Sequence, residues 1–169
     1  AQARGADMTP FLESASRVAD RLAAVFSIGF LIALLLLISA QVVARYLFHA
    51  PPGWLEELAR YCMVWSGLLG ASCAYRRGMD PALAQPPAWV RRALPRIAGM
   101  LRPLVALVFT SVLLLTSIGF LQRHGYLVTD LLRVNSALVV AIVPITAALI
   151  SLHALAELSA AGRAEPAGR

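Results

Sequence analysis

The sequence has 169 residues, of which 59% are hydrophobic and 14% are charged, and its formal net charge is +6. Soluble domains carry about 25% charged residues, so the composition excludes an ordinary soluble domain, and the length allows a single domain. All fifteen basic residues are arginines that fall between apolar runs, which argues against a nucleic-acid partner and favours a protein embedded in membrane lipid.

The first predicted membrane span covers residues 22–44, which are 23 residues without a formal charge. Residues 1–21 are expected to form a cytoplasmic N-terminal segment, whose amphipathic part, Phe11 to Arg21, lies at the membrane surface. A cleaved signal peptide is the alternative, because arginines precede the run. Its apolar part is longer than the roughly 7–15 residues of such a signal, so a retained span is predicted.

The second predicted span, residues 54–77, follows a Pro-Pro-Gly turn. As a helix it extends about 36 Å at ~1.5 Å per residue, which exceeds a hydrocarbon layer about 30 Å thick. Gly53 is the expected N-cap of this helix. Glu56 and Glu57 near the start and Arg77 at the end complement the helix dipole.

Two sides of this second segment differ in composition. One side is aromatic and aliphatic and contains Trp54, Leu58, Tyr61, Trp65, Leu68 and Ser72. The other side has small residues four positions apart, which let membrane helices approach closely; the pairs are Ser66/Gly70, Gly67/Ala71 and Gly70/Ala74. Cys62 and Cys73 are separated by about 16 Å along the helix, too far for a disulfide, and are expected to be packing residues.

The remaining chain predicts two further spans. Residues 88–102 place apolar residues on one side with arginines at the border, which predicts an interfacial helix between spans two and three; a solvated basic loop is the alternative. The third span is predicted at residues 103–122 and the fourth at residues 136–156. Asn135 is the expected cap of the fourth span, and Pro144 is expected to kink its middle.

The arginine distribution orients this four-helix membrane domain, residues 22–158. Eleven arginines lie on the side of the two termini and of the connection at residues 78–102, and four lie on the other side. Cytoplasmic connections carry the excess of basic residues. The predicted fold is therefore an all-α integral membrane protein of a bacterial inner membrane, with four transmembrane helices, both termini cytoplasmic, and residues 159–169 as a cytoplasmic tail.

The sequence has few residues placed for chemistry. It contains no phosphate-binding glycine loop and no His/Cys cluster with metal spacing. His49 and His124 lie in the non-cytoplasmic connections and His153 near the opposite end of the last span, so no pair is placed for haem. The predicted span interiors also lack the ionisable residue that a small proton-coupled exporter needs. We therefore expect no catalytic residue, no metal and no cofactor.

A resemblance to a known family is carried mainly by residues 42–78, which read VVARYLFHAPPGWLEELARYCMVWSGLLGASCAYRRG. This block resembles the DctQ-like small membrane subunit of tripartite ATP-independent periplasmic (TRAP) transporters. The last span, NSALVVAIVPITAALISLHAL, is similar to the final helix of that family with its central proline. Members often have a histidine soon after Gly78, where Met79 and Asp80 stand here, so any role of that histidine does not transfer.

The resemblance implies a scaffold, or stator, that supports sodium-coupled solute uptake. The partners would be a large TRAP membrane subunit that binds substrate and sodium, and a periplasmic substrate-binding protein that delivers the solute. The candidate subunit-interface residues are Arg45, Trp54, Glu56, Glu57, Arg60, Trp65, Gly67, Gly70, Ala71 and Arg77. The alternatives left open are a stand-alone small four-helix transporter and a membrane haem electron carrier.

Three charged residues, Glu56, Glu57 and Arg60, lie within five positions near the start of the second predicted span. On a helix, Arg60 can pair with Glu56 at i+4 and with Glu57 at i+3. Such a pair only partly offsets the cost of a charge near hydrocarbon. We expect the trio to meet polar groups of the large subunit, or of the first helix near Arg45; the alternative is a local helix cap.

Reporter fusions test the predicted topology. Fusions after Gly78 and Ala161 are expected to report a cytoplasmic location, and fusions near Gly53 and Gly125 a periplasmic one, because the arginine-rich side stays in the cytoplasm. A periplasmic signal at Ala161 would contradict the prediction of four spans.

Overall fold

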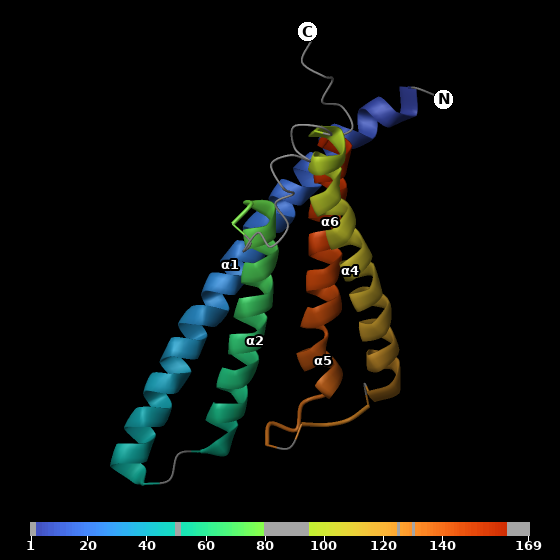
Figure 1. Cartoon of the computed structure of the whole chain (residues 1–169). Coiled ribbons are helices and arrows are strands. Elements are labelled where there is room, and N and C mark those ends of the chain that lie inside the picture. Colours follow the sequence, from blue (N-terminus) through green and yellow to red (C-terminus); the bar gives the residue numbers. More distant parts are fainter. Residues whose placement is uncertain (1–2, 50–51, 80–94, 125, 130, 162–169) are drawn as a thin grey trace.

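The computed structural model describes residues 3–49, 52–79, 95–124, 126–129 and 131–161. Within these ranges the chain is helical and has no β-strand; the helices are α1 (Ala3–Phe48), α2 (Gly53–Arg76), α4 (Pro95–His124), α5 (Ser136–Val140) and α6 (Ile142–Ala161). The start of α1 and the end of α6 lie at the same end of the molecule (Figure 1). The all-helical prediction is confirmed.

Helix α1 runs without a break through Arg21, where the sequence predicted a boundary between a surface segment and the first span. Leu12–Leu47 within it is long and apolar enough to cross a membrane. Ser16 and Asp20, which the sequence placed at the surface, are buried. They are buried because this part of α1 continues to pack against neighbouring helices.

Helix α2 has nearly the predicted bounds. Its N-cap is Pro52 rather than Gly53, and the carbonyl of Pro52 accepts a hydrogen bond from the N–H of Leu55 at 3.1 Å. At the other end Gly78 adopts φ +65°, and the N–H groups of Gly78 and Met79 bond back to the carbonyls of Tyr75 and Ala74. This is a Schellman ending, which requires a left-handed residue and so favours glycine at position 78.

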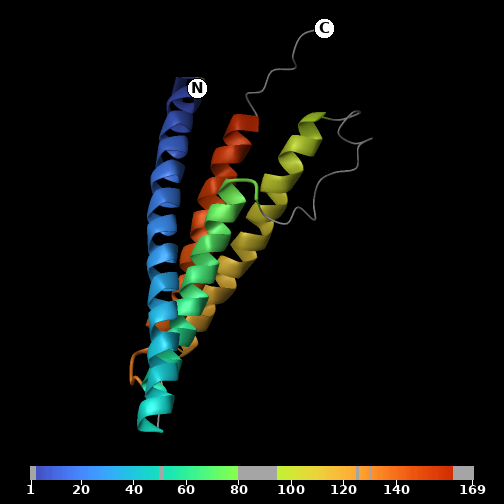
Figure 2. The same cartoon turned by 90° about the vertical axis from the view of Figure 1, so that its left-hand side faces the viewer.

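The long helices form two pairs. Helices α1 and α2 pack as one hairpin, α4 packs on α6, and α6 contacts both α1 and α2. In Figure 2, α1 and α2 stand side by side in front of the α4–α6 pair. Where α1, α2 and α6 meet, the core contains Ala23, Leu69, Cys73 and Ile142. Cys62 and Cys73 are free and buried, which confirms them as packing residues.

The small residues of α2 fall on two different faces. The hydroxyl of Ser27 on α1 donates to the carbonyl of Ser66 at 2.8 Å, and a Cβ at Gly70 would lie 3.4 Å from the same hydroxyl oxygen. Gly67 has no atom within 4 Å of its Cβ position, and Ala71 is exposed. The single small-residue side that the sequence predicted is therefore divided: Ser66 and Gly70 pack on α1, whereas Gly67 and Ala71 face outward.

The break in the last predicted span lies earlier than expected. Asn135 caps α5 as predicted, because its side chain accepts from the N–H of Ala137 at 2.8 Å. Helix α5 then ends at Val140 and α6 begins at Ile142. Pro144 explains this position, since a proline ring clashes with the carbonyl four residues earlier and removes its hydrogen-bond donor.

Three segments in the described ranges are long and apolar enough to cross a membrane: Leu12–Leu47, Gly99–Arg123 and Ser136–Ala160. The predicted span at residues 54–77 forms α2 but is not among them, so its crossing stays a prediction. Residues 88–94 of the predicted interfacial helix lie outside the described residues. Its remaining residues, 95–102, form the start of α4, which continues from them without a break. Residues 162–169 of the predicted tail also lie outside the described ranges.

The two glycines of α2 provide a test of this packing. Gly70→Leu is expected to push α1 and α2 apart and to destabilise the chain by about 1–3 kcal/mol, whereas Gly67→Leu leaves its internal packing unchanged. Thermal unfolding of the two variants in detergent, followed by size-exclusion chromatography, measures the difference. Equal unfolding midpoints would show that the close approach at Gly70 does not stabilise the hairpin.

Candidate functional site

Between α4 and α5 the chain forms a short strap, which we define as the described residues 126–129 and 131–135. Val128 and Asn135 form an antiparallel bridge, and the N–H of Thr129 donates to the carbonyl of Val134 at 2.8 Å. The hydroxyl oxygen of Thr129 also accepts from the N–H of Val134 at 3.0 Å. Arg133 takes the left-handed φ of 51° that reverses the chain.

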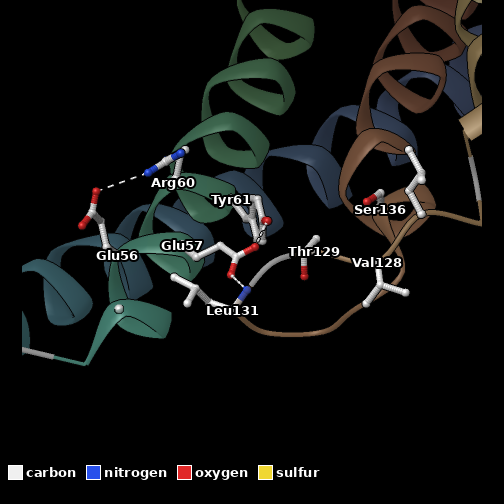
Figure 3. Close-up of a pocket in the computed structure, with 10 residues that line it drawn as sticks. Glu56, Glu57, Arg60, Tyr61, Val128, Thr129, Leu131 and Ser136 are labelled. Atoms are coloured by element: carbon white, nitrogen blue, oxygen red, sulfur yellow. Dashed lines mark hydrogen bonds and ion pairs between the residues drawn. The ribbon is translucent and has the colours of Figure 1, made fainter.

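Glu57 connects the start of α2 to this strap. One carboxylate oxygen, Oε2, accepts from the N–H groups of Leu131 and Leu132 at 3.1 and 2.9 Å. The other oxygen, Oε1, accepts from the hydroxyl of Tyr61, one turn further along α2. The residue is only 9% exposed. Figure 3 shows Glu57 directed towards the strap, so this carboxylate joins the α1–α2 hairpin to the α4–α5 connection.

Glu56 and Arg60 form a separate pair on the outer side of α2. Arg60 donates to Oε1 of Glu56 at 3.2 Å, and the two side chains are 67% and 71% exposed. Figure 3 shows Glu56 directed away from the strap. The predicted trio is therefore divided: Glu56–Arg60 is an exposed i,i+4 pair worth about 0.3–0.5 kcal/mol, and Glu57 pairs with backbone groups instead of Arg60.

An open pocket of about 640 Å³ lies between the strap and the first turns of α2. Its polar lining includes Glu57, Tyr61, Thr129 and Ser136, and its apolar lining includes Leu131. The carboxylate of Glu57 is already satisfied by three hydrogen bonds. Glu57 thus holds the strap at one side of this pocket, and the exposed Glu56–Arg60 pair also lines it.

A second polar cluster lies at the opposite end of the bundle. Asp20 of α1 pairs with Arg76 at 3.2 Å and with Arg77 at 3.5 Å, and its side chain is only 8% exposed. Arg76 also donates to the hydroxyl of Ser16 at 3.0 Å, and that hydroxyl lies 2.8 Å from Nδ1 of His153 on α6. One chain of polar contacts therefore links α1, α2 and α6.

The same end holds a contact that includes α4. Arg102 donates to Glu157 at 3.0 Å and to the carbonyl of Tyr75 at 2.6 Å. Its guanidinium lies 4.6 Å from the centre of the Tyr75 ring, and the Tyr75 hydroxyl donates to Glu157 at 3.2 Å. Together the two groups of contacts connect α1, α2, α4 and α6 at this end.

The other predicted interface residues are dispersed along the hairpin. Arg45 is exposed near the end of α1, and Trp54 is 45% exposed. Trp65 is internal: its ring lies 5.3 Å from Phe30, and its Nε1–H donates to the carbonyl of Val139 at 3.2 Å. Gly70 packs on α1 and Arg77 pairs with Asp20, whereas Gly67 and Ala71 face outward.

Sequence reasoning missed most of the residues that join the helices. Asp20 and His153 lie inside long apolar helices, so the statement that the span interiors lack ionisable residues was wrong for the observed helix bounds. Tyr61 lies on the aromatic side of the predicted second span, and Glu157 follows the predicted fourth span, so the sequence predicts no contact between helices for either residue. The sequence does contain one indication of these contacts. Asp20 and Glu157 are acidic residues on the arginine-rich side of the predicted topology, where each can pair with an arginine.

These contacts are suited to holding helices together. In the described part of the chain, no group of three His, Cys, Asp or Glu side chains is placed to hold a metal ion. Helices α1, α2, α4 and α6 contribute side chains to the cluster at one end of the bundle. At the other end Glu57 of α2 holds the strap. The arrangement therefore fixes the relative positions of the two helix pairs.

Comparison with known proteins places the chain among transporter components. A family model described as "Tripartite ATP-independent periplasmic transporters, DctQ component" matches residues 34–163. The chain is also similar to the sialic acid TRAP transporter permease protein SiaT of Haemophilus influenzae (strain 86-028NP), with 44% identity over 46 residues. That match covers 27% of this chain and 8% of the relative's length.

The neighbouring glutamates of α2 allow a matched test of the strap contact. Glu57→Ala is expected to release the strap, because the N–H groups of Leu131 and Leu132 lose their acceptor. Limited trypsin digestion in detergent, followed by mass spectrometry, should then show several-fold faster cleavage after Arg133, which is exposed in the strap.

Glu56→Ala is the control, since it removes the same charge one position away but only from an exposed pair. Cleavage after Arg133 should remain at the wild-type rate in this variant. Equal rates in both variants would contradict the assignment of Glu57 as the residue that holds the strap.

Proposed function

This chain belongs to the DctQ family, the small membrane subunits of TRAP transporters, and we propose that it is the fixed scaffold on which a large membrane subunit transports solute. In this proposal the large subunit binds solute and sodium, and a periplasmic binding protein delivers the solute. Solute choice is assigned to these partners, because Glu57 binds the strap and Arg102 binds Glu157 within this chain.

The observation that supports a scaffold is the position of the polar contacts. Glu57 holds the strap at one end, and Asp20 and Glu157 hold four helices at the other. Between these ends, the described helices carry no acidic side chain. A transport site within the bilayer needs buried ionisable or coordinating groups, whereas a scaffold needs its helices fixed relative to one another.

We further propose that α2 is the fourth membrane crossing. Its 24 residues measure about 36 Å, and it packs along α1, which is long and apolar enough to span. Four crossings place both termini in the cytoplasm of a bacterial inner membrane, in agreement with the arginine distribution. The interfacial helix predicted at residues 88–102 belongs to this proposal, with residues 95–102 as the start of α4.

The two alternative functions differ in what they require of the buried ionisable residues. A stand-alone transporter would use one of them for coupling, but Asp20 and His153 lie towards one end and are engaged with Arg76 and Ser16. A haem carrier needs paired histidines, but His49 follows the last residue of α1, whereas Nδ1 of His153 lies 2.8 Å from the hydroxyl of Ser16 near the start of α1. Haem absorbance of the purified chain would support that second alternative.

Reconstitution tests the scaffold proposal. Proteoliposomes containing this chain alone are expected to show no sodium-driven solute uptake, because the coupling site belongs to the large subunit. Uptake should appear only when the cognate large subunit and binding protein are both present. Sodium-driven flux from the isolated chain would overturn the proposal and favour a stand-alone transporter.

A further inference from the structure

A small pocket of about 220 Å³ lies among helices α1, α2, α4 and α6, near the start of α1 and the end of α6 (Figure 1). The stretch of each helix that carries no formal charge stops at this level, at Arg21 in α1, Arg76 in α2, Arg102 in α4 and Glu157 in α6. Charged side chains are costly in the hydrocarbon core of a bilayer, so the end of the four uncharged stretches marks the depth of the phospholipid headgroups. The pocket therefore lies where a headgroup can reach it.

Side chains of both charges line this pocket, and two of them retain binding capacity. Arg76 donates from Nε to the hydroxyl of Ser16 at 3.0 Å and from Nη1 to Asp20 at 3.2 Å. A guanidinium has five N–H donors, and Nη2 of Arg76 donates to no group in the described chain. Glu13 lines the same pocket, and its exposed carboxylate forms neither an ion pair nor a hydrogen bond with any described residue. The pocket thus offers one donor group and one acceptor group to an occupant.

Two buried groups hold Arg76 in position. Ser16 and His153 are each 3% exposed, and the Ser16 hydroxyl lies 2.8 Å from Nδ1 of His153. The hydroxyl accepts from Arg76, and among the described residues Nδ1 is the acceptor for its own hydrogen, which leaves the ring hydrogen on Nε2. This Nε2 has no partner in the described chain, and a buried N–H without an acceptor is costly. An occupant that brings an oxygen atom to the side of the pocket that His153 lines is therefore favoured.

We propose that this pocket binds the headgroup of a phospholipid that carries both a phosphate and an ammonium group, of the kind found in phosphatidylethanolamine. Nη2 of Arg76 donates to a phosphate oxygen, and the carboxylate of Glu13 accepts from the ammonium group. The acyl chains extend along the uncharged stretches of the helices. This site needs only that the chain lies in a membrane, and it does not depend on the transport role proposed above.

The charge balance of the pocket favours a zwitterionic headgroup over an anionic one. The charged side chains that line it in the described part of the chain are Arg76, Arg102, Glu13 and Glu157, so their formal charges cancel. Arg102 pairs with Glu157, which leaves Arg76 and Glu13 to meet the occupant. A headgroup with a phosphate alone would place its negative charge near Glu13, and like charges brought together are unfavourable. An ammonium group in the same headgroup compensates that carboxylate.

Added lipid tests the headgroup class. The full chain is purified, stripped of lipid in detergent, and unfolded thermally with dioleoyl phosphatidylethanolamine, with dioleoyl phosphatidylglycerol, or with soluble glycerophosphoethanolamine. Phosphatidylethanolamine at a hundredfold excess over its dissociation constant is expected to raise the unfolding midpoint by roughly 5 °C. The other two compounds at the same concentration are expected to leave the midpoint unchanged. An equal rise with phosphatidylglycerol would rule out a zwitterionic headgroup, an equal rise with the soluble compound would rule out a lipid, and no rise with any of the three would rule out the site.

A pair of matched substitutions locates the binding site. Glu13→Gln removes the acceptor of the ammonium group and leaves the contacts between helices intact, because the Glu13 carboxylate has no partner in the described chain. It is expected to weaken phosphatidylethanolamine binding roughly tenfold, which corresponds to the loss of one charged hydrogen bond. Glu56→Gln, the same change at an exposed glutamate at the start of α2, is the control and should bind like wild type. Native mass spectrometry across a lipid titration measures both affinities, and equal binding by Glu13→Gln and wild type would overturn the proposed site.

Discussion

Helices in a bilayer gain little from apolar contact with one another, because the lipid is as apolar as their side chains. The relative positions of these helices therefore depend on polar contacts and close backbone approach. Both occur here at defined places: Glu57 holds the strap at one end, Asp20 and Glu157 connect helices at the other, and Gly70 lies against Ser27 between them.

The polar contacts that stabilise the helix bundle lie where charged side chains cost least when the helices insert into a membrane. A buried charge is tolerated when it is paired and hydrogen-bonded, and its cost is lower near the ends of a span than in the middle. Asp20 has two arginine partners and Glu57 has three hydrogen-bond donors. The chain therefore fixes its helices with charged side chains at the two ends of the bundle, and the described helices carry no acidic side chain between those ends.

The sequence predicted the helices better than their contacts. The bounds of α2 follow from local signals, namely the prolines before it and Gly78 after it, and Asn135 and Pro144 explain the cap and the break in the last span. The partner of Glu57 could not be predicted, because backbone N–H groups of a strap more than 70 residues away leave no side-chain pattern. Asp20 was missed because its partner Arg76 is 56 residues away.

Glu56 and Glu57 show how adjacent identical residues can serve different purposes. Successive residues of an α-helix are turned by about 100°, so Glu57 enters the interior and meets the strap while Glu56 stays outside with Arg60. The interior glutamate stabilises the fold of the chain itself. Among the described residues the exterior one pairs only with Arg60, on the exposed side of α2. Two adjacent positions of one helix thus differ because the strap covers only one of them.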